Sequence, residues 1–164
     1  MMSRRWRVLS MRCRAAVTAM VLATAARVSD AQSVTALTGL SFGTILSGTT
    51  TSIAPTVTGA MSFDIYGPIG LNGGWTLTLP TTLTRSGGGA TMPITFCSTC
   101  GVFRISNTNP LGGVTFNPNA SVLGISLLSA LHVYVWIGGS VSPPLSQMSG
   151  QYTGTVVLTL APII

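Results

Sequence analysis

Apolar residues in this chain recur mainly at every second position, in short runs that Gly, Pro, Asn and Ser separate. Neighbouring side chains on a strand point to opposite faces, so this spacing predicts antiparallel strands. In the run WTLTLP, the apolar Trp75, Leu77 and Leu79 alternate with threonines. Pro80 then ends the run, because proline cannot donate to a sheet. The pattern favours an all-β fold of roughly eight short strands.

Two other runs alternate in the same way, MSFDIYG at residues 61–67 and LHVYVWIGG at residues 131–139. The first predicts an inward face that includes Phe63, with Asp64 pointing outward. The second predicts that His132 lies on the outward face of its strand. Such an alternation places apolar residues on one face of the strand and polar residues on the other, which is typical of a sheet with one buried side.

The remaining segments complete a single domain. Residues 152–160 predict a last strand, and residues 67–74 (GPIGLNGG) have the composition of a turn. Residues 120–131 leave helix and strand open, because their apolar spacing is helix-like but Gly124 and β-branched residues interrupt it. No long-period repeat and no linker divides the chain, so one β-sandwich is predicted. An outer-membrane barrel is the structural rival, disfavoured because charged lumen residues and aromatic girdles are lacking.

The N-terminal segment has the features of a secretory signal peptide. Residues 1–14 carry five Arg and no acid, and a short apolar run follows at residues 15–26. Ser29 and Ala31 then supply the small residues of a cleavage site, so we expect cleavage after Ala31. A membrane-spanning helix needs about 20 apolar residues, so no stable membrane span is expected. The chain is predicted to be exported to the periplasm, the cell surface or the medium, with residues 32–164 as the β-sandwich domain.

Removal of residues 1–31 changes the charge of the protein. The full chain has a formal net charge of +6, but only Arg85, Arg104 and Asp64 remain charged afterwards, two positive and one negative, which gives +1. Nucleic-acid binding needs clustered basic residues, so no nucleic-acid partner is expected. Weak charge and exposed strand edges favour self-association or association with other subunits of a surface fibre.

Few residues of the processed chain could perform catalysis. Asp64 and His132 could join a serine in a nucleophilic triad, but the alternation puts both on polar strand faces, where such residues are usually solvated. The chain has no paired carboxylates for acid/base catalysis. No second histidine accompanies His132 as a metal ligand. We therefore predict no enzyme, no catalytic or metal-ligating residue and no cofactor.

Cys97 and Cys100 form a C-x-x-C motif with three possible roles. A zinc ribbon needs four ligands, and Cys13 leaves with the signal peptide. A thioredoxin-like redox centre needs a helix after its first cysteine, whereas the strand-like VFRIS follows here. The third role, which we expect, is a disulfide across a tight turn between neighbouring strands in an oxidising compartment.

Tyr134 and Trp136 are the candidate binding surface. Both are predicted to point outward on a strand with little charge, where aromatic rings could stack on a sugar or contact a partner. Such rings often cover a neighbouring loop instead. The pair supports an alternative function, a carbohydrate-binding or adhesin module that acts as a monomer.

Three stretches resemble the bacterial secreted domain family DUF 4402. They are LSFGTILSG at residues 40–48, residues 60–96 and residues 134–160, and together they cover most of the processed chain. The residues that carry the resemblance are Phe42, Gly43, Gly67, Leu79, Pro80, Gly138, Gly139, Gly150, Tyr152 and Gly154.

That family is similar to spore coat U and fimbrial-subunit domains. The resemblance implies an immunoglobulin-like antiparallel β-sandwich, secretion, and a structural or adhesive role at the cell surface without an enzymatic site. In fimbrial relatives, an N-terminal extension of one subunit completes the sheet of the next. Gln32–Gly39 is the segment available for that role here. We therefore expect an exported, non-enzymatic surface protein, a pilin-like or coat-like subunit.

Overall fold

The computed structural model describes residues 32–67, 70–127 and 131–160, and the chain forms only strands and loops within these ranges. The predicted signal peptide therefore lies outside the described residues. No helix in the described part is long and apolar enough to cross a membrane. The strands are β1 (Ser33–Thr38), β2 (Thr51–Ile53), β3 (Met61–Gly67), β4 (Gly70–Thr78), β5 (Thr82–Arg85), β6 (Thr91–Thr95), β7 (Gly101–Ile105), β8 (Val114–Phe116), β9 (Val122–Leu127), β10 (Leu131–Ile137), β11 (Gly139–Val141), β12 (Tyr152–Thr153) and β13 (Val157–Leu160).

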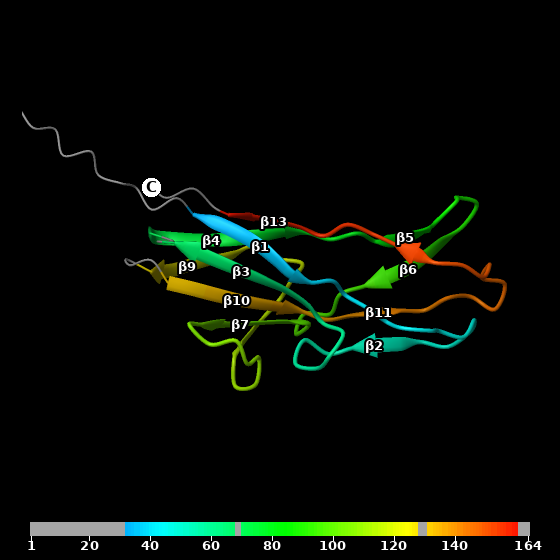
Figure 1. The fold of residues 1–164 in the computed structure, drawn as a ribbon, viewed down its shortest axis with the longest axis horizontal. Helices are drawn as coiled ribbons and strands as arrows, with labels where there is room; N and C mark the ends of the chain where they lie inside the picture. The colour runs from blue at the N-terminus through cyan, green and yellow to red at the C-terminus, as the bar shows by residue number, and fades with distance from the viewer. Residues whose placement is uncertain (1–31, 68–69, 128–130, 161–164) are drawn as a thin grey trace, which may run out of the picture.

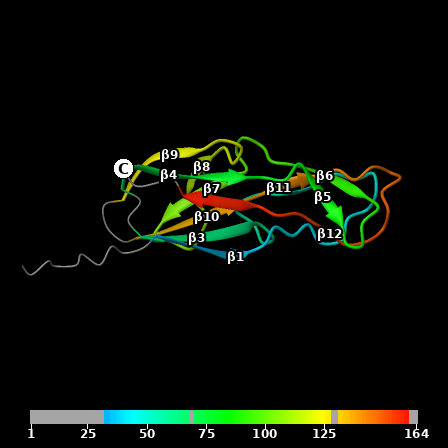
Figure 2. The same ribbon diagram turned by 90° about the horizontal axis from the view of Figure 1, so that it is seen from above.

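The strands form three sheets, and every pairing is antiparallel. The broad sheet has the order β1-β3-β10-β7-β8, and the narrow sheet has the order β13-β4-β9. The distal sheet has the order β12-β5-β6-β11-β2. The broad and narrow sheets lie at one end of an elongated molecule, and the distal sheet lies at the other end (Figures 1 and 2). The predicted all-β antiparallel sandwich is confirmed.

The main core lies between the broad and narrow sheets. Trp75 of the narrow sheet is fully buried against Ile65 of β3 and the inner residues of β10. Its indole makes edge-on contacts with Phe103 at 5.3 Å and Phe116 at 5.8 Å between ring centroids. Val133, Val135 and Ile137 complete this core, so the alternation of the sequence correctly predicts which face of β10 is buried.

A second, smaller core stabilises the distal sheet. Its buried residues are Leu83, Met92, Ile94 and Val141. Unlike the main core, it is covered partly by the segment between β1 and β2, through Leu40, Phe42 and Ile45. The two cores are joined because β10 continues into β11 across Gly138, so one continuous segment contributes to both the broad and the distal sheet.

Three segments differ from or sharpen the sequence predictions. Residues 120–131, left open above, contain strand β9. The predicted turn at residues 67–74 is wrong at its C-terminal end, because β4 begins at Gly70 and pairs with β9 through irregular register around Gly73. The predicted last strand is instead two strands: β12 belongs to the distal sheet and β13 belongs to the narrow sheet. A cluster of glycines can thus indicate irregular strand pairing as well as a turn.

The β10–β11 junction tolerates no side chain at Gly138. A Cβ there would lie 2.1 Å from the carbonyl oxygen of Ile53. We expect Gly138→Ala to lower the free energy of unfolding by about 1–3 kcal/mol, because backbone must move to admit the methyl group. Gly39→Ala is the matched control, since a Cβ at Gly39 meets nothing within 4 Å. Urea unfolding measures both; equal stability of the two variants would contradict the crowding at Gly138.

Candidate functional site

An open groove lies at the distal end of the molecule. It has a volume of about 770 Å³ and lies between the segment Gly39–Ser47 and the distal sheet, with the loop that precedes β12 along one side. We call it the end groove. It borders the second core, and the segment opposite the distal sheet is a single irregular stretch rather than a sheet. The distal sheet is therefore covered less completely than the broad sheet.

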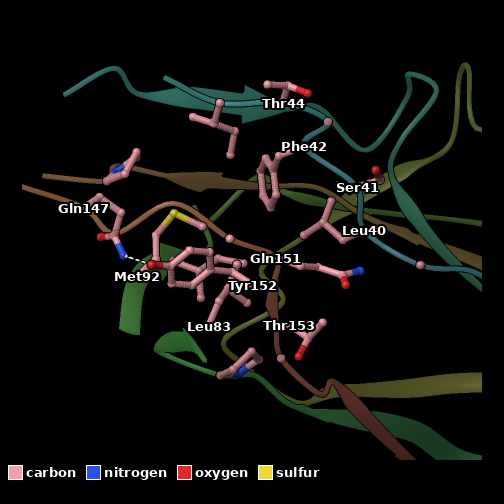
Figure 3. Close-up of a pocket in the computed structure, with 18 of the residues that line it drawn as sticks. Leu40, Ser41, Phe42, Thr44, Leu83, Met92, Gln147, Gln151, Tyr152 and Thr153 are labelled. Carbon is pink, nitrogen blue, oxygen red and sulfur yellow. Dashed lines mark hydrogen bonds between the residues drawn. The ribbon is translucent and has the colours of Figure 1, made fainter. Parts of the chain in front are cut away.

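Apolar side chains and polar groups line the end groove in nearly equal measure. Leu40 and Phe42 point from one side toward Leu83, Met92 and Tyr152 on the other (Figure 3). Leu83 and Met92 come from neighbouring positions of β5 and β6, where they are paired in register. Since their side chains lie on the same face of the distal sheet, they form a common apolar floor.

Tyr152 connects the loop of the groove to the distal sheet. Its hydroxyl donates a hydrogen bond to the carbonyl oxygen of Met148 at 2.7 Å and accepts one from the side-chain amide of Gln147. The same amide donates to the carbonyl oxygen of Thr91 at 3.2 Å. Figure 3 shows the Gln147–Tyr152 bond beside Met92. These bonds hold one wall of the groove in place without closing its mouth.

Large apolar side chains are exposed along the rim. Leu46 is 72% exposed and Met148 is 50% exposed, and both line the end groove. Exposed apolar residues that adjoin an apolar cavity mark an interaction surface more specifically than scattered ones. The arrangement can therefore offer apolar contacts to an extended segment that lies along the groove.

Most residues that carry the family resemblance lie at this groove or at structural junctions. Phe42, Gly43, Pro80, Gly150, Tyr152 and Gly154 line the groove. Leu79 packs against the main core instead. Gly67 has a φ of 121° at the end of β3, a conformation that favours glycine. Gly138 and Gly139 lie at the junction of β10 and β11, where both are buried.

The segment Gln32–Gly39 is not a free arm in the structure. Its residues Ser33–Thr38 form β1, which pairs with β3 of the same chain as the edge strand of the broad sheet. All six residues of β1 are exposed, and the register shifts between Ala36 and Thr38. A donor role for this segment would require it to leave β3.

Cys97 and Cys100 form a disulfide, with their Cα atoms 5.0 Å apart. The turn between them joins β6 to β7, which belong to different sheets. The expectation that the disulfide connects neighbouring strands is thus wrong in detail, because the chain crosses between sheets at this point. Strand β7 begins directly after Cys100, where a thioredoxin-like site would have a helix.

The outer face of the broad sheet brings together residues that the sequence separates widely. His132 Nδ1 lies 2.9 Å from Asp64 Oδ1, a pair joined across β10 and β3. Tyr134 is half-buried beside them, whereas Trp136 is only 9% exposed. The expectation of an accessible Trp136 is therefore wrong, since its neighbours across the sheet, Ser62 and Val102, are buried too.

Sequence reasoning considered Asp64 and His132 together only as possible triad members, placed each on an outward face and then treated both as solvated, so their contact was not predicted. The register of β3 against β10 is the information that a single sequence lacks. Within the ranges that the structure describes, no group of three or more His, Cys, Asp or Glu side chains could hold a metal ion.

Comparisons of the chain with protein-family models, with curated proteins and with solved structures find no match. The resemblance to DUF 4402 thus stays a prediction.

We expect iodoacetamide to label neither Cys97 nor Cys100 in the purified protein when no reductant is present. Replacing both by serine should lower the free energy of unfolding by about 2 kcal/mol or less, because the disulfide closes a very short loop. Ser98→Ala, in the same turn, is the control. Two labelled thiols in the mass spectrum of the unreduced protein would disprove the bond.

Proposed function

We propose that this chain is an exported, non-enzymatic structural or adhesive protein of the bacterial surface, a pilin-like or coat-like subunit whose copies associate through the end groove. The observation that carries the proposal is the end groove itself. Leu83 and Met92 form its apolar floor, and exposed apolar residues lie along its rim. The occupant is an extended segment of a second copy, because a strand of one subunit can complete the fold of another.

The energy available at the rim favours association. Burial of a leucine or methionine side chain contributes about 1.5–3 kcal/mol relative to exposure. Leu46 and Met148 together therefore offer several kcal/mol on the same principle if a partner covers them. This contribution offsets part of the entropic cost of association.

The edge strand β1 also supports self-association. Soluble proteins usually protect edge strands with lysine, proline or inward-pointing charges. The sequence SVTALT of β1 has none of these, and Val34 and Leu37 on it are exposed. With only Asp64, Arg85 and Arg104 charged among the described residues, electrostatic repulsion between copies is weak.

Two substitutions at the rim test the proposal. We expect the double variant Leu46→Ser/Met148→Ser to lose concentration-dependent assembly, because it removes apolar surface that the second copy would bury. Both side chains are exposed, so stability should change by less than about 1 kcal/mol. Sedimentation velocity and negative-stain electron microscopy measure the assembly.

The control is Leu111→Ser, which removes a leucine whose exposure, 63%, lies between those of Leu46 and Met148, from the loop between β7 and β8. Assembly of this variant should match that of the unaltered protein. If the rim variant assembles as the unaltered protein does, or if the unaltered protein stays monomeric at all concentrations, the groove is not the site of association.

A further inference from the structure

A row of rings crosses the outer face of the broad sheet. The centroid of Tyr66 lies 4.7 Å from that of His132, and His132 lies nearly parallel to Tyr134 at 5.8 Å. Trp136 continues the row at 6.1 Å from Tyr134. The rings come from alternate positions of β10 and from the position of β3 directly opposite His132. They form a rigid row because each strand is held by sheet hydrogen bonds on both sides.

Two ionisable side chains of the described residues, Asp64 and His132, lie beside the same row. Residues 32–67, 70–127 and 131–160 contain one acid, Asp64, and one histidine, His132. The two meet on this face, where Nδ1 of the imidazole lies 2.9 and 3.0 Å from the two carboxylate oxygens. Arg104 of β7 lies opposite Tyr134, and its guanidinium donates to the carbonyl oxygens of Asn109 and Leu111 in the β7–β8 loop. With so few charges among the described residues, the meeting of Asp64 and His132 needs an explanation.

Stability does not supply that explanation. The side chains of His132 and Asp64 are 46% and 19% exposed, and partly solvated ion pairs contribute little to folding. The core beneath is already complete, because the inner residues of β3 and β10 are buried without any contribution from the outer face. The Asp64–His132 pair instead resembles the few convergent polar groups by which a binding site orients its ligand.

The accessible part of the row is the end that contains Tyr66. Tyr66 is 37% exposed, whereas Trp136 at the other end is covered. The hydrogen bond to Asp64 occupies Nδ1 of His132, and Nε2 has no hydrogen-bond partner among the described residues. Nε2 and the outer lone pairs of the carboxylate are therefore available to a ligand that lies on Tyr66.

We infer that Tyr66, His132, Tyr134 and Asp64 form a binding site for a neutral saccharide. A sugar ring has an apolar face of C–H groups that packs on an aromatic ring and an edge of hydroxyls that hydrogen-bond with carboxylate and imidazole. The Asp64 carboxylate is engaged by His132, and Arg104 donates to the carbonyl oxygens of Asn109 and Leu111, so neither charge is directed at an ionic ligand. A protein partner would need about 800 Å² of complementary surface, far more than these few side chains provide.

The proposal goes beyond assembly, because the saccharide site lies on the broad sheet and the end groove on the distal sheet. A glycan array carrying neutral, sialylated and sulfated glycans identifies the ligand. Nuclear magnetic resonance titration of the unassembled protein with the neutral glycan that binds best then gives its dissociation constant. We expect binding to neutral glycans, with shifted signals from Tyr66 and His132.

Two variants test the residues. Tyr66→Ala removes the exposed ring and Asp64→Asn removes the carboxylate charge while keeping its shape, and each should weaken binding about tenfold or more. Leu46→Ser/Met148→Ser leaves this face intact and should bind with unchanged affinity even if it no longer assembles, which separates the two proposals. The inference fails if no neutral glycan binds, if only anionic glycans bind, or if neither Tyr66→Ala nor Asp64→Asn changes the affinity.

Discussion

The packing of Trp75 against the inner face of the broad sheet is the interaction on which the rest of the structure depends. Its fully buried ring lies among aliphatic residues of β3 and β10 and makes edge-on contacts with Phe103 and Phe116. These contacts join the narrow sheet to four of the five strands that face it. Because this core fixes the position of β10, it also fixes where the outer side chains of β10 lie and where β11 begins.

The two candidate sites follow from two different consequences of that arrangement. The end groove exists because the continuous segment of β10 and β11 extends the molecule beyond the narrow sheet, so the distal sheet is covered only by the irregular Gly39–Ser47 segment. The row of rings exists because alternation on β10 directs every second side chain away from Trp75. The sites proposed for assembly and for ligand binding are thus physically separate, since they lie on different sheets.

Local rules predicted the individual elements better than their assembly. Alternation in residues 61–67 and 131–137 correctly assigned Phe63 to the core and His132 to the outer face, because period-two spacing and burial are both local properties. The glycines at residues 70–74 led to the wrong prediction of a turn, because they lie in β4 where it pairs irregularly with β9. The disulfide was expected from spacing, but its position between two sheets depends on where the chain crosses over.

The sequence by itself determined an all-β fold, the buried face of each main strand and the sparse charge of the surface, because these depend on residue type and spacing along the chain. Only the tertiary structure decided which strands are neighbours. That choice brought Asp64 to His132, covered Trp136 while leaving Tyr66 exposed, and left a groove beside Leu83 and Met92. The physical reason is strand register: residues far apart in the chain become neighbours only through pairings that no local pattern specifies.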